Sequence, residues 1–420
     1  MKHRRLLILL TLGLILCMML PSMASAQATL TFAFWGNADE IKMKQQLIDL
    51  YMQKNPDVKI EGTYTDGGQY PTKLQTWFAS NTAPDVMGIA NDIIYPYRDL
   101  GVFEDLKSYM EQDGLLEGTW NPVAVDVFKD AQGHVLAAPY IYKIPAVVYN
   151  KTMFDKAGLT YPQAGWTEAE MLELAQKLTA GSGRNKLYGL RLDWWPGAIY
   201  RNLYGNPMYD VNGKAMTAAG NEQFKEALQM FVTLIRDLKV SPDDTMAKAI
   251  GGGFETGKYA MAITAPWEME SFAKLIGSNF EWDIVPLPVN EKWGPWRGNL
   301  FADGYTISSS SQNKEAAWDF IKFLTTDPEA QAISSRMGIP MLSSYANSEA
   351  YLKEFYGNPP YSKLAFVEML DQATGWETSG VWAKINDEVS NQYKMVLNGK
   401  QDLDTAIANI QAAGEKFLAE

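Results

Sequence analysis

Cysteine and histidine are almost absent from this chain. Its 420 residues include one cysteine, Cys17, and two histidines, His3 and His134. We expect the first 26 residues to be removed, which leaves no thiol and so excludes disulfides, zinc–thiolate sites and cysteine nucleophiles. His134 is then the last histidine, so a histidine-rich metal site is excluded and a serine triad would depend on that one residue. His134 follows Gln132-Gly133, and we interpret it as a turn residue.

Long apolar runs are scarce as well. The single one, residues 6–20, follows three basic residues and precedes Pro21 and the triplet Ala24-Ser25-Ala26. This order predicts a secretory signal peptide, residues 1–26, and an exported protein that is periplasmic, at the cell surface or extracellular. The run is shorter than the roughly 20 apolar residues of a membrane-spanning helix. A lipid anchor on Cys17 would need a small residue in place of Leu16, and a retained N-terminal anchor is the remaining alternative.

Positive charge is in deficit, because 37 Lys and Arg face 49 Asp and Glu for a net charge of −12. Nucleic acid and anionic lipid surfaces are therefore poor partners. Glycine-rich phosphate loops are missing too, since Gly251-Gly252-Gly253 lacks the lysine and hydroxyl residue that would follow. We expect no cofactor and no metal. A chain of this length exceeds what one core supports, so two lobes and a monomer are the expectation.

The residues that are present predict an α/β protein. Strand-like and helix-like segments alternate from the start of the mature chain: strand 30–35, helix 39–54, strand 58–64, helix 70–79 and strand 86–90. Such alternation favours a parallel sheet with right-handed crossovers. Further along, Thr167 and Glu170 form a capping box, and Asp327-Pro328 begins another helix.

Ligands of open parallel sheets bind beyond the carboxyl ends of the strands. Two such loops are residues 36–40, which include Asn37 and Glu40, and the dipeptide Asn91-Asp92. These loops, together with Trp35 at the end of the first strand, are where we expect a binding site.

Ten short segments follow one another in a characteristic order. They are residues 34–36 (Phe-Trp-Gly), 83–86 (Ala-Pro-Asp-Val), 138–140 (Ala-Pro-Tyr), 148–159, 166–168 (Trp-Thr-Glu), 254–261, 265–267 (Ala-Pro-Trp), 283–288, 303–318 and 338–340 (Gly-Ile-Pro). In this order they resemble the extracellular solute-binding proteins of the carbohydrate type, the maltose-binding-protein-like receptors of sugar ABC importers. The resemblance covers nearly all of the mature chain.

The resemblance implies a two-lobed periplasmic-binding-protein fold (type II-like). Each lobe would be a mostly parallel sheet flanked by helices, with the ligand in the cleft between the lobes and closure by a hinge. Residues 27–141, completed by 287–340, would form one lobe. Residues 142–286, completed by 341–420, would form the other. The implied partners are a sugar or oligosaccharide and the membrane permease subunits of an ABC importer, and no catalytic residue is implied.

The candidate ligand-binding residues suit a sugar, which offers an apolar face to an aromatic ring and hydroxyls to charged or amide groups. By resemblance, Trp267 and Trp382 would be stacking aromatics, and Asp92 the acid that binds hydroxyls. The full set is Trp35, Asn37, Glu40, Asp92, Lys143, Trp194, Trp195, Trp267, Asp303, Trp376 and Trp382.

Each candidate has a plainer alternative. Asp92 would otherwise cap a helix, and Lys143, which stands where some relatives carry an acid, would otherwise be a surface charge. Trp194 and Trp195 are adjacent and precede a turn, so both cannot easily face one core. We expect other tryptophans to be core residues, namely Trp77, Trp120, Trp282 and Trp318, and leave Trp293 and Trp296 open between core and cleft.

Two other functions remain open. A receptor for a non-sugar solute, such as a polyamine, a metal chelate or a peptide, would share the same architecture. A secreted glycoside hydrolase would need two carboxylates about 5 to 10 Å apart. No series of eight strand–helix units, as in a barrel enzyme, is readable in the sequence.

Overall fold

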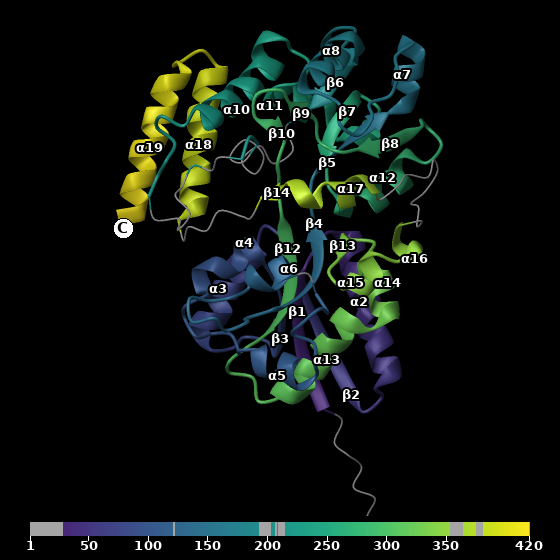
Figure 1. Ribbon diagram of the computed structural model, residues 1–420, viewed down its shortest axis with the longest axis vertical. Coiled ribbons are helices and arrows are strands. Elements are labelled where there is room, and N and C mark those ends of the chain that lie inside the picture. Colours follow the sequence, from purple (N-terminus) through teal and green to yellow (C-terminus); the bar gives the residue numbers. More distant parts are fainter. Residues whose placement is uncertain are drawn as a thin grey trace, which may run out of the picture.

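The computed structural model describes residues 28–120, 122–192, 203–205, 208, 215–352, 364–374 and 381–419. The expected signal peptide and three of the candidate residues, Trp194, Trp195 and Trp376, lie outside these ranges. The described residues form two lobes stacked along the long axis, each built on its own sheet (Figure 1). This confirms the predicted two-lobed α/β fold.

The first lobe contains a six-stranded sheet in the order β13-β4-β12-β3-β1-β2. Its strands are β1 (Ala28–Trp35), β2 (Val58–Thr65), β3 (Val86–Ala90), β4 (Ala138–Lys143), β12 (Phe301–Ile307) and β13 (Ile339–Pro340). β1 pairs in parallel with β2 and β3, but β12 runs antiparallel to both β3 and β4. The pairing is therefore mixed where we predicted a mostly parallel sheet, because β12 enters the sheet from the direction of the second lobe.

The second lobe has a four-stranded sheet in the order β6-β7-β5-β8. Its strands are β5 (Ala146–Asn150), β6 (Tyr188–Arg191), β7 (Tyr259–Thr264) and β8 (Trp282–Val285). β6 and β7 are parallel, whereas β5 is antiparallel to β7 and β8. β5 arrives from the first lobe as β12 arrives from the second, and each runs antiparallel to both of its neighbours; in the first sheet β13 is also antiparallel to β4. Two short ribbons join β9 (Val289–Asn290) to β10 (Gly294–Pro295), and β11 (Gly298–Asn299) to β14 (Ala373–Thr374).

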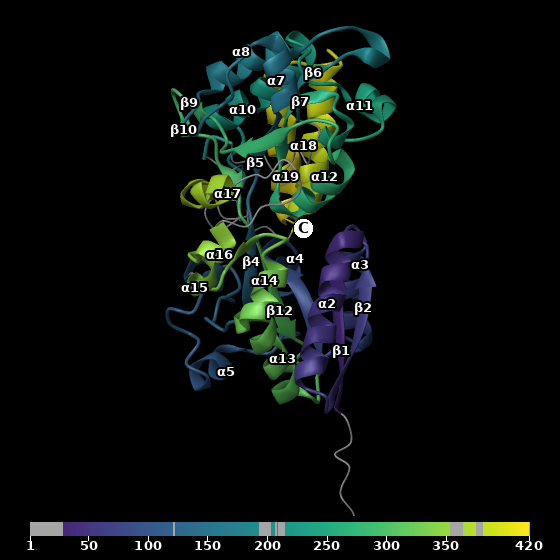
Figure 2. The same cartoon turned by 90° about the vertical axis from the view of Figure 1, so that its right-hand side faces the viewer.

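Helices flank both sheets. In Figure 1, α2 (Ala38–Lys54) and α14 (Pro328–Ser334) lie to the right of the first sheet, and α3 (Tyr70–Ser80) and α4 (Asn91–Ile94) lie to its left. The same lobe carries α5 (Lys107–Gln112), α6 (Pro122–Asp126) and α13 (Lys314–Thr326). The second lobe carries α7 (Lys151–Ala157), α8 (Glu168–Leu178), α10 (Glu222–Val232), α11 (Asp244–Ile250), α12 (Met269–Ile276), α18 (Trp382–Leu397) and α19 (Leu403–Ala419). Figure 2 shows α2 and α3 reaching up from the first lobe toward the second.

The predicted elements of the first 90 residues are confirmed to within two residues at each end. Both predicted helix starts are confirmed as well. Thr167 Oγ1 accepts a hydrogen bond from the Glu170 amide at 3.1 Å, and Glu170 Oε2 accepts one from the Thr167 amide at 2.7 Å. Asp327 Oδ1 accepts from the amides of Glu329 and Ala330.

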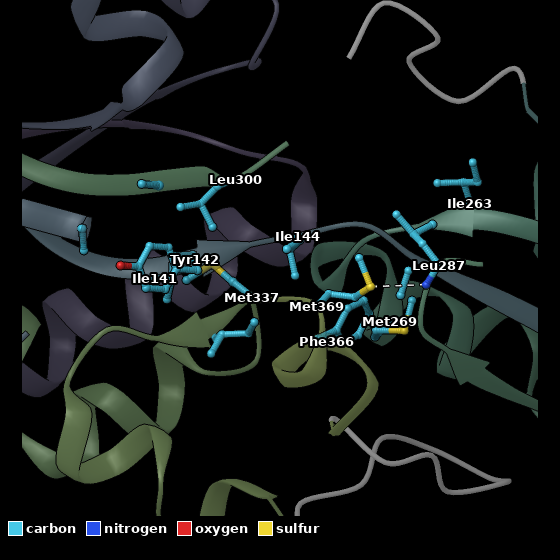
Figure 3. Packing of buried hydrophobic residues seen from close by; sticks show 14 of the residues in the cluster. Ile141, Tyr142, Ile144, Ile263, Met269, Leu287, Leu300, Met337, Phe366 and Met369 are labelled. Atoms are coloured by element: carbon cyan, nitrogen blue, oxygen red, sulfur yellow. Dashed lines mark hydrogen bonds between the residues drawn. The ribbon is translucent and has the colours of Figure 1, made fainter. Parts of the chain in front are cut away.

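An apolar cluster continues across the junction between the lobes (Figure 3). It includes Ile144, on the segment that links β4 to β5, and Leu287, whose amide donates to the Met369 sulfur at 3.3 Å. Helix α17 (Leu364–Glu368) contributes the buried Phe366. Strand β4 of the first lobe continues through Lys143, two residues beyond the expected lobe boundary at residue 141. The other predicted lobe boundaries stay predictions.

Tryptophan burial follows the sequence pattern for most of the expected core residues. Trp120, Trp282 and Trp318 are buried as predicted, and Trp77 is partly buried. Trp296, which was left open, is also buried, and its indole nitrogen donates to Glu168 at 2.6 Å. No helix within the described ranges is long and apolar enough to cross a bilayer.

Candidate functional site

A pocket opens where the carboxyl ends of β1, β3 and β4 meet the first residues of β12, at the end of the first lobe that faces the second. This is the edge at which ligands of α/β sheets bind. The residues that line it are Phe34, Trp35, Glu40, Lys44, Gly88, Tyr140, Lys143, Asp303 and Met337. Four of the predicted candidates, Trp35, Glu40, Lys143 and Asp303, therefore lie together.

The start of α2 fixes the Glu40 side chain. Asn37 Oδ1 accepts hydrogen bonds from the amides of Asp39 and Glu40 at 2.9 and 3.0 Å, and Glu40 Oε2 accepts one from the Asn37 amide at 2.9 Å. A Cβ at Gly36 would lie 2.6 Å from Glu40 Cβ, so only glycine fits there. The amide oxygen of Asn37 is thus occupied in capping the helix, while the second oxygen of Glu40 faces Lys143.

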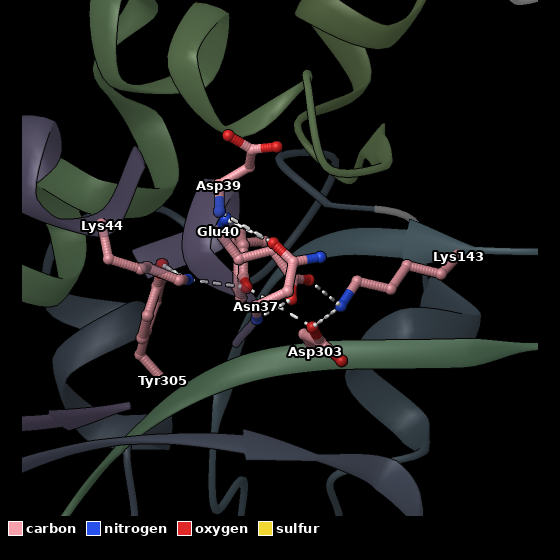
Figure 4. Close-up of polar contacts among 8 residues, drawn as sticks. Asn37, Asp39, Glu40, Lys44, Lys143, Asp303 and Tyr305 are labelled. Carbon is pink, nitrogen blue, oxygen red and sulfur yellow. Dashed lines mark hydrogen bonds and ion pairs between the residues drawn. The ribbon is translucent and has the colours of Figure 1, made fainter. Parts of the chain in front are cut away.

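Lys143 lies at the centre of the pocket's charges (Figure 4). Its Nζ is 2.7 Å from Asp303 Oδ2 and 3.5 Å from Glu40 Oε1. Lys143 is 8% exposed and Asp303 2%, so the alternative of a surface charge is wrong for Lys143. Burial lowers the pKa of Lys143, but the attraction of Asp303 and Glu40 outweighs it and raises that pKa above its ordinary value.

Beneath this pair lies a second lysine that the sequence analysis missed. Lys44 is 4% exposed, and its Nζ donates to the hydroxyls of Tyr140 at 2.7 Å and Tyr305 at 2.5 Å. The two tyrosine rings are stacked with centroids 4.4 Å apart, and the Tyr140 hydroxyl donates to Asp303 Oδ2 at 3.4 Å. Burial lowers the pKa of Lys44 to about 7, against the opposing attraction of Asp303.

A sequence signal for Lys44 did exist. Positions 43, 44, 47, 48 and 51 form the buried stripe of α2, and all of them except Lys44 are apolar or aromatic. A lysine on such a stripe needs polar partners in the interior, because an unpartnered charge there is costly. Tyr140 and Tyr305 lie in strands whose sequences are mostly apolar, so the sequence did not predict that they are polar partners of Lys44.

Two tryptophans lie near the charged group, Trp35 in the pocket lining and Trp267 beside Lys143. Trp35 packs on Tyr70 with ring centres 5.0 Å apart, and the Tyr70 hydroxyl donates to the carbonyls of Ala33 and Gly88. Trp267, in the turn after β7 of the second lobe, has its ring centre 5.4 Å from Lys143 Nζ. The arrangement offers a ligand two aromatic rings and a set of fixed hydrogen-bonding groups.

The other candidates are placed but not tested. Asp92 lies in α4 and Trp382 begins α18, but their side chains lie outside what the structure describes. Beside Asp92, the Asn91 side chain bonds the backbone of Leu300 and Ala302, and so ties α4 to the start of β12. Among the described residues, no three His, Cys, Asp or Glu side chains are grouped so as to hold a metal ion.

Ion pairs join the two lobes beside the pocket. Lys274 of α12 pairs with Asp39 at the start of α2, and Glu270 of α12 pairs with Arg336, which follows α14. Lys274 and Glu270 also contact each other at 3.3 Å. The lobes are therefore in polar contact along one edge of the pocket.

Comparisons with known proteins show the family and the fold of the chain. The family model described as bacterial extracellular solute-binding protein matches residues 37–331, more than half of the chain. The chain is similar to a solved ABC substrate-binding protein from Listeria monocytogenes in complex with cycloalternan, with 26% identity, a TM-score of 0.82, and coverage of 94% of this chain and 99% of that one.

Two curated relatives differ in the ligands that their names state. One is the maltotriose-binding protein of Pyrococcus abyssi, 24% identical over 74% of this chain and 67% of the relative. The other is the sn-glycerol-3-phosphate-binding periplasmic protein of Brucella melitensis, 23% identical over 95% of each chain.

Proposed function

The chain belongs to the family of bacterial extracellular solute-binding proteins, and from this premise we propose that it is an exported receptor for a sugar or oligosaccharide. It binds the ligand between its two lobes as a monomer and delivers it to the membrane permease subunits of an ABC importer. It catalyses no reaction.

The observation that carries the proposal is the pairing of aromatic rings with a buried charged group. Trp35 and Trp267 supply apolar faces, and Glu40, Lys143 and Asp303 supply acceptors and donors that are already oriented by one another. A pyranose needs both kinds of contact, because its ring faces are apolar and its rim carries hydroxyls. Groups that are fixed before binding lose little side-chain entropy when the ligand arrives.

The charge balance of the pocket favours a neutral ligand over a phosphate. Lys44 and Lys143 are matched by Glu40 and Asp303, so the pocket has no surplus positive charge for an anion. A glycerol phosphate would compete with these carboxylates for Lys143. We therefore place this chain with the oligosaccharide receptors.

The test is calorimetric titration of the purified protein against maltotriose, cycloalternan, mannobiose and sn-glycerol-3-phosphate, with each sugar recovered and checked for cleavage. Saturable one-to-one binding of an intact sugar supports the proposal. Binding of glycerol phosphate alone would move the assignment to a non-sugar solute, and cleaved sugar would make the protein a hydrolase.

A further inference from the structure

The buried Lys44 lines the inner wall of the pocket, where its Nζ donates to the hydroxyls of Tyr140 and Tyr305. We propose that Lys44 is a positioning residue, which acts through Tyr140 to hold Asp303 against Lys143 and so couples the binding pocket to pH. Only the predicted change in ligand affinity rests on the proposed function. The coupling itself is a property of the free protein.

The hydrogen-bond directions carry the argument. An ammonium group can only donate, so a protonated Lys44 obliges Tyr140 to use its own proton elsewhere. Two acceptors are within reach: the Tyr305 hydroxyl, and Asp303 Oδ2 at 3.4 Å, the same oxygen that pairs with Lys143 at 2.7 Å. The carboxylate is the stronger acceptor of the two because it is charged. Donors thus run in one direction, from Lys44 through Tyr140 to Asp303. A neutral lysine can accept a hydrogen bond, so Tyr140 can then turn its proton back and release Asp303.

A purely structural role would not call for a lysine at this position. The ammonium lies 4.0 and 4.6 Å from the centres of the Tyr140 and Tyr305 rings, in a place that an apolar side chain such as methionine could fill without desolvating a charge. Charged and titratable groups face it from every element around it: Glu40 from its own helix, Tyr140 and Lys143 from β4, and Asp303 and Tyr305 from β12. Asp303 and Glu40 favour its proton, whereas burial and Lys143 oppose it.

These opposing effects bring the pKa of Lys44 to about 7, so its protonation changes within the range of ordinary growth conditions. Below that pH the protonated lysine directs Tyr140 onto Asp303. Above it the support is lost, and Asp303 and Lys143 become less fixed. We expect ligand affinity to fall about tenfold between pH 6 and pH 8, the loss of one hydrogen bond to a charged group.

The first measurement needs no ligand. The protein carries Glu268→Gln in every sample of this titration, because burial raises the pKa of the Glu268 carboxyl beside Trp267 to about 7. It is labelled with 5-fluorotryptophan and titrated by fluorine NMR, and the Trp267 resonance is assigned from a Trp267→Phe variant. Because Lys143 lies over this ring, we expect the resonance to shift with a midpoint near pH 7. Lys44→Met and Tyr140→Phe should both abolish that step. Tyr140→Phe keeps the ring stack and serves if Lys44→Met does not fold. Lys42→Met, which replaces an exposed lysine of the same helix, should retain the step.

The second measurement is the dissociation constant of maltotriose at pH 6 and pH 8. The wild type should lose affinity with rising pH, and Lys44→Met should show the same affinity at both values. If maltotriose does not bind, that failure counts against the proposed function, while the fluorine titration still decides the coupling. A Trp267 step that persists unchanged in both Lys44→Met and Tyr140→Phe would overturn the inference.

Discussion

The indole ring of Trp267 meets the phenyl ring of Phe301 edge to face, with ring centres 6.0 Å apart and planes at 87°. The first residue follows β7 in the second lobe, and the second begins β12 in the first lobe. Trp267 therefore reaches across to the lobe that holds Lys143 and Asp303. A ligand held between the lobes would contact the Trp267 ring, so a substitution of Trp267 tests the proposed binding site directly.

Trp267→Ala should weaken sugar binding by about 1 to 3 kcal/mol, since the variant loses both buried apolar area and the stacking face. Calorimetry with the sugar identified in the titration panel measures the change. Trp293→Ala is the matched control. Trp293 is a partly buried tryptophan of the second lobe, between β9 and β10, and its indole nitrogen donates to Glu226 of α10. An unchanged dissociation constant for Trp267→Ala would mean that the sugar stacks elsewhere.

The ion pairs of α12 predict a bias toward the closed arrangement of the lobes. Glu270→Gln removes the partner of Arg336 and one contact of Lys274, so the open arrangement should gain about 1 kcal/mol, as expected for partly exposed pairs. Small-angle scattering should report a larger radius of gyration for this variant at low salt than for the wild type. High salt should reduce the difference, because these charges are screened.

The control for that experiment is Lys292→Met. Lys292 pairs with Glu222 and Glu226 within the second lobe, so its loss should leave the radius of gyration unchanged. Equal values for wild type and Glu270→Gln at every salt concentration would show that these pairs do not hold the lobes together.

Local pattern was sufficient for the elements around the pocket. The period of apolar residues predicted β1 and α2, and the residue types at strand ends drew attention to Trp35 and Glu40. The resemblance added Trp267 and Asp303. Asp303 was expected on a loop entering Gly304-Tyr305, but the structure places it within β12. The structure places Glu40, Lys143 and Asp303 within one charged group.

What the sequence did not predict depends on contacts between distant segments. Strand direction is one example, because an apolar run such as residues 301–307 reads the same in either orientation, and only the path of the chain through the other lobe reverses it. Lys44 is another. Its partners are 96 and 261 residues away, so neither tyrosine could be matched to it from periodicity.

Lys143→Met should destabilise the folded protein by about 3 to 5 kcal/mol, because it leaves the Asp303 carboxylate buried without its ion-pair partner. Urea unfolding measures the change. The double variant Lys143→Met/Asp303→Asn removes the orphaned charge and should recover most of the lost stability. If the double variant is as unstable as the single one, the cost arises from lost packing of the lysine stem rather than from the unpaired charge.

Glu268 predicts how stability depends on pH between 4.5 and 7. It lies next to Trp267, and its Oε2 accepts a hydrogen bond from Thr264 Oγ1 at 2.8 Å. Burial raises the pKa of Glu268 from its ordinary 4.5 to about 7. In this window the folded chain holds a proton on Glu268 that the unfolded chain has released, so this group makes the free energy of unfolding fall as pH rises, with no further loss above about 7.

Glu268→Gln should remove that contribution, since the amide does not titrate. At pH 4 the variant and the wild type should have similar unfolding free energies, and by pH 7 the variant should have gained on the order of 2 kcal/mol relative to the wild type. The comparison is best made at or below pH 7. Above pH 7 Lys44 makes the free energy of unfolding rise with pH, because the lysine keeps its proton in the unfolded chain but loses it in the folded one. Urea unfolding of both proteins at pH 4, 5.5 and 7 tests the prediction, and parallel pH profiles would show that Glu268 is ionised in the folded state throughout.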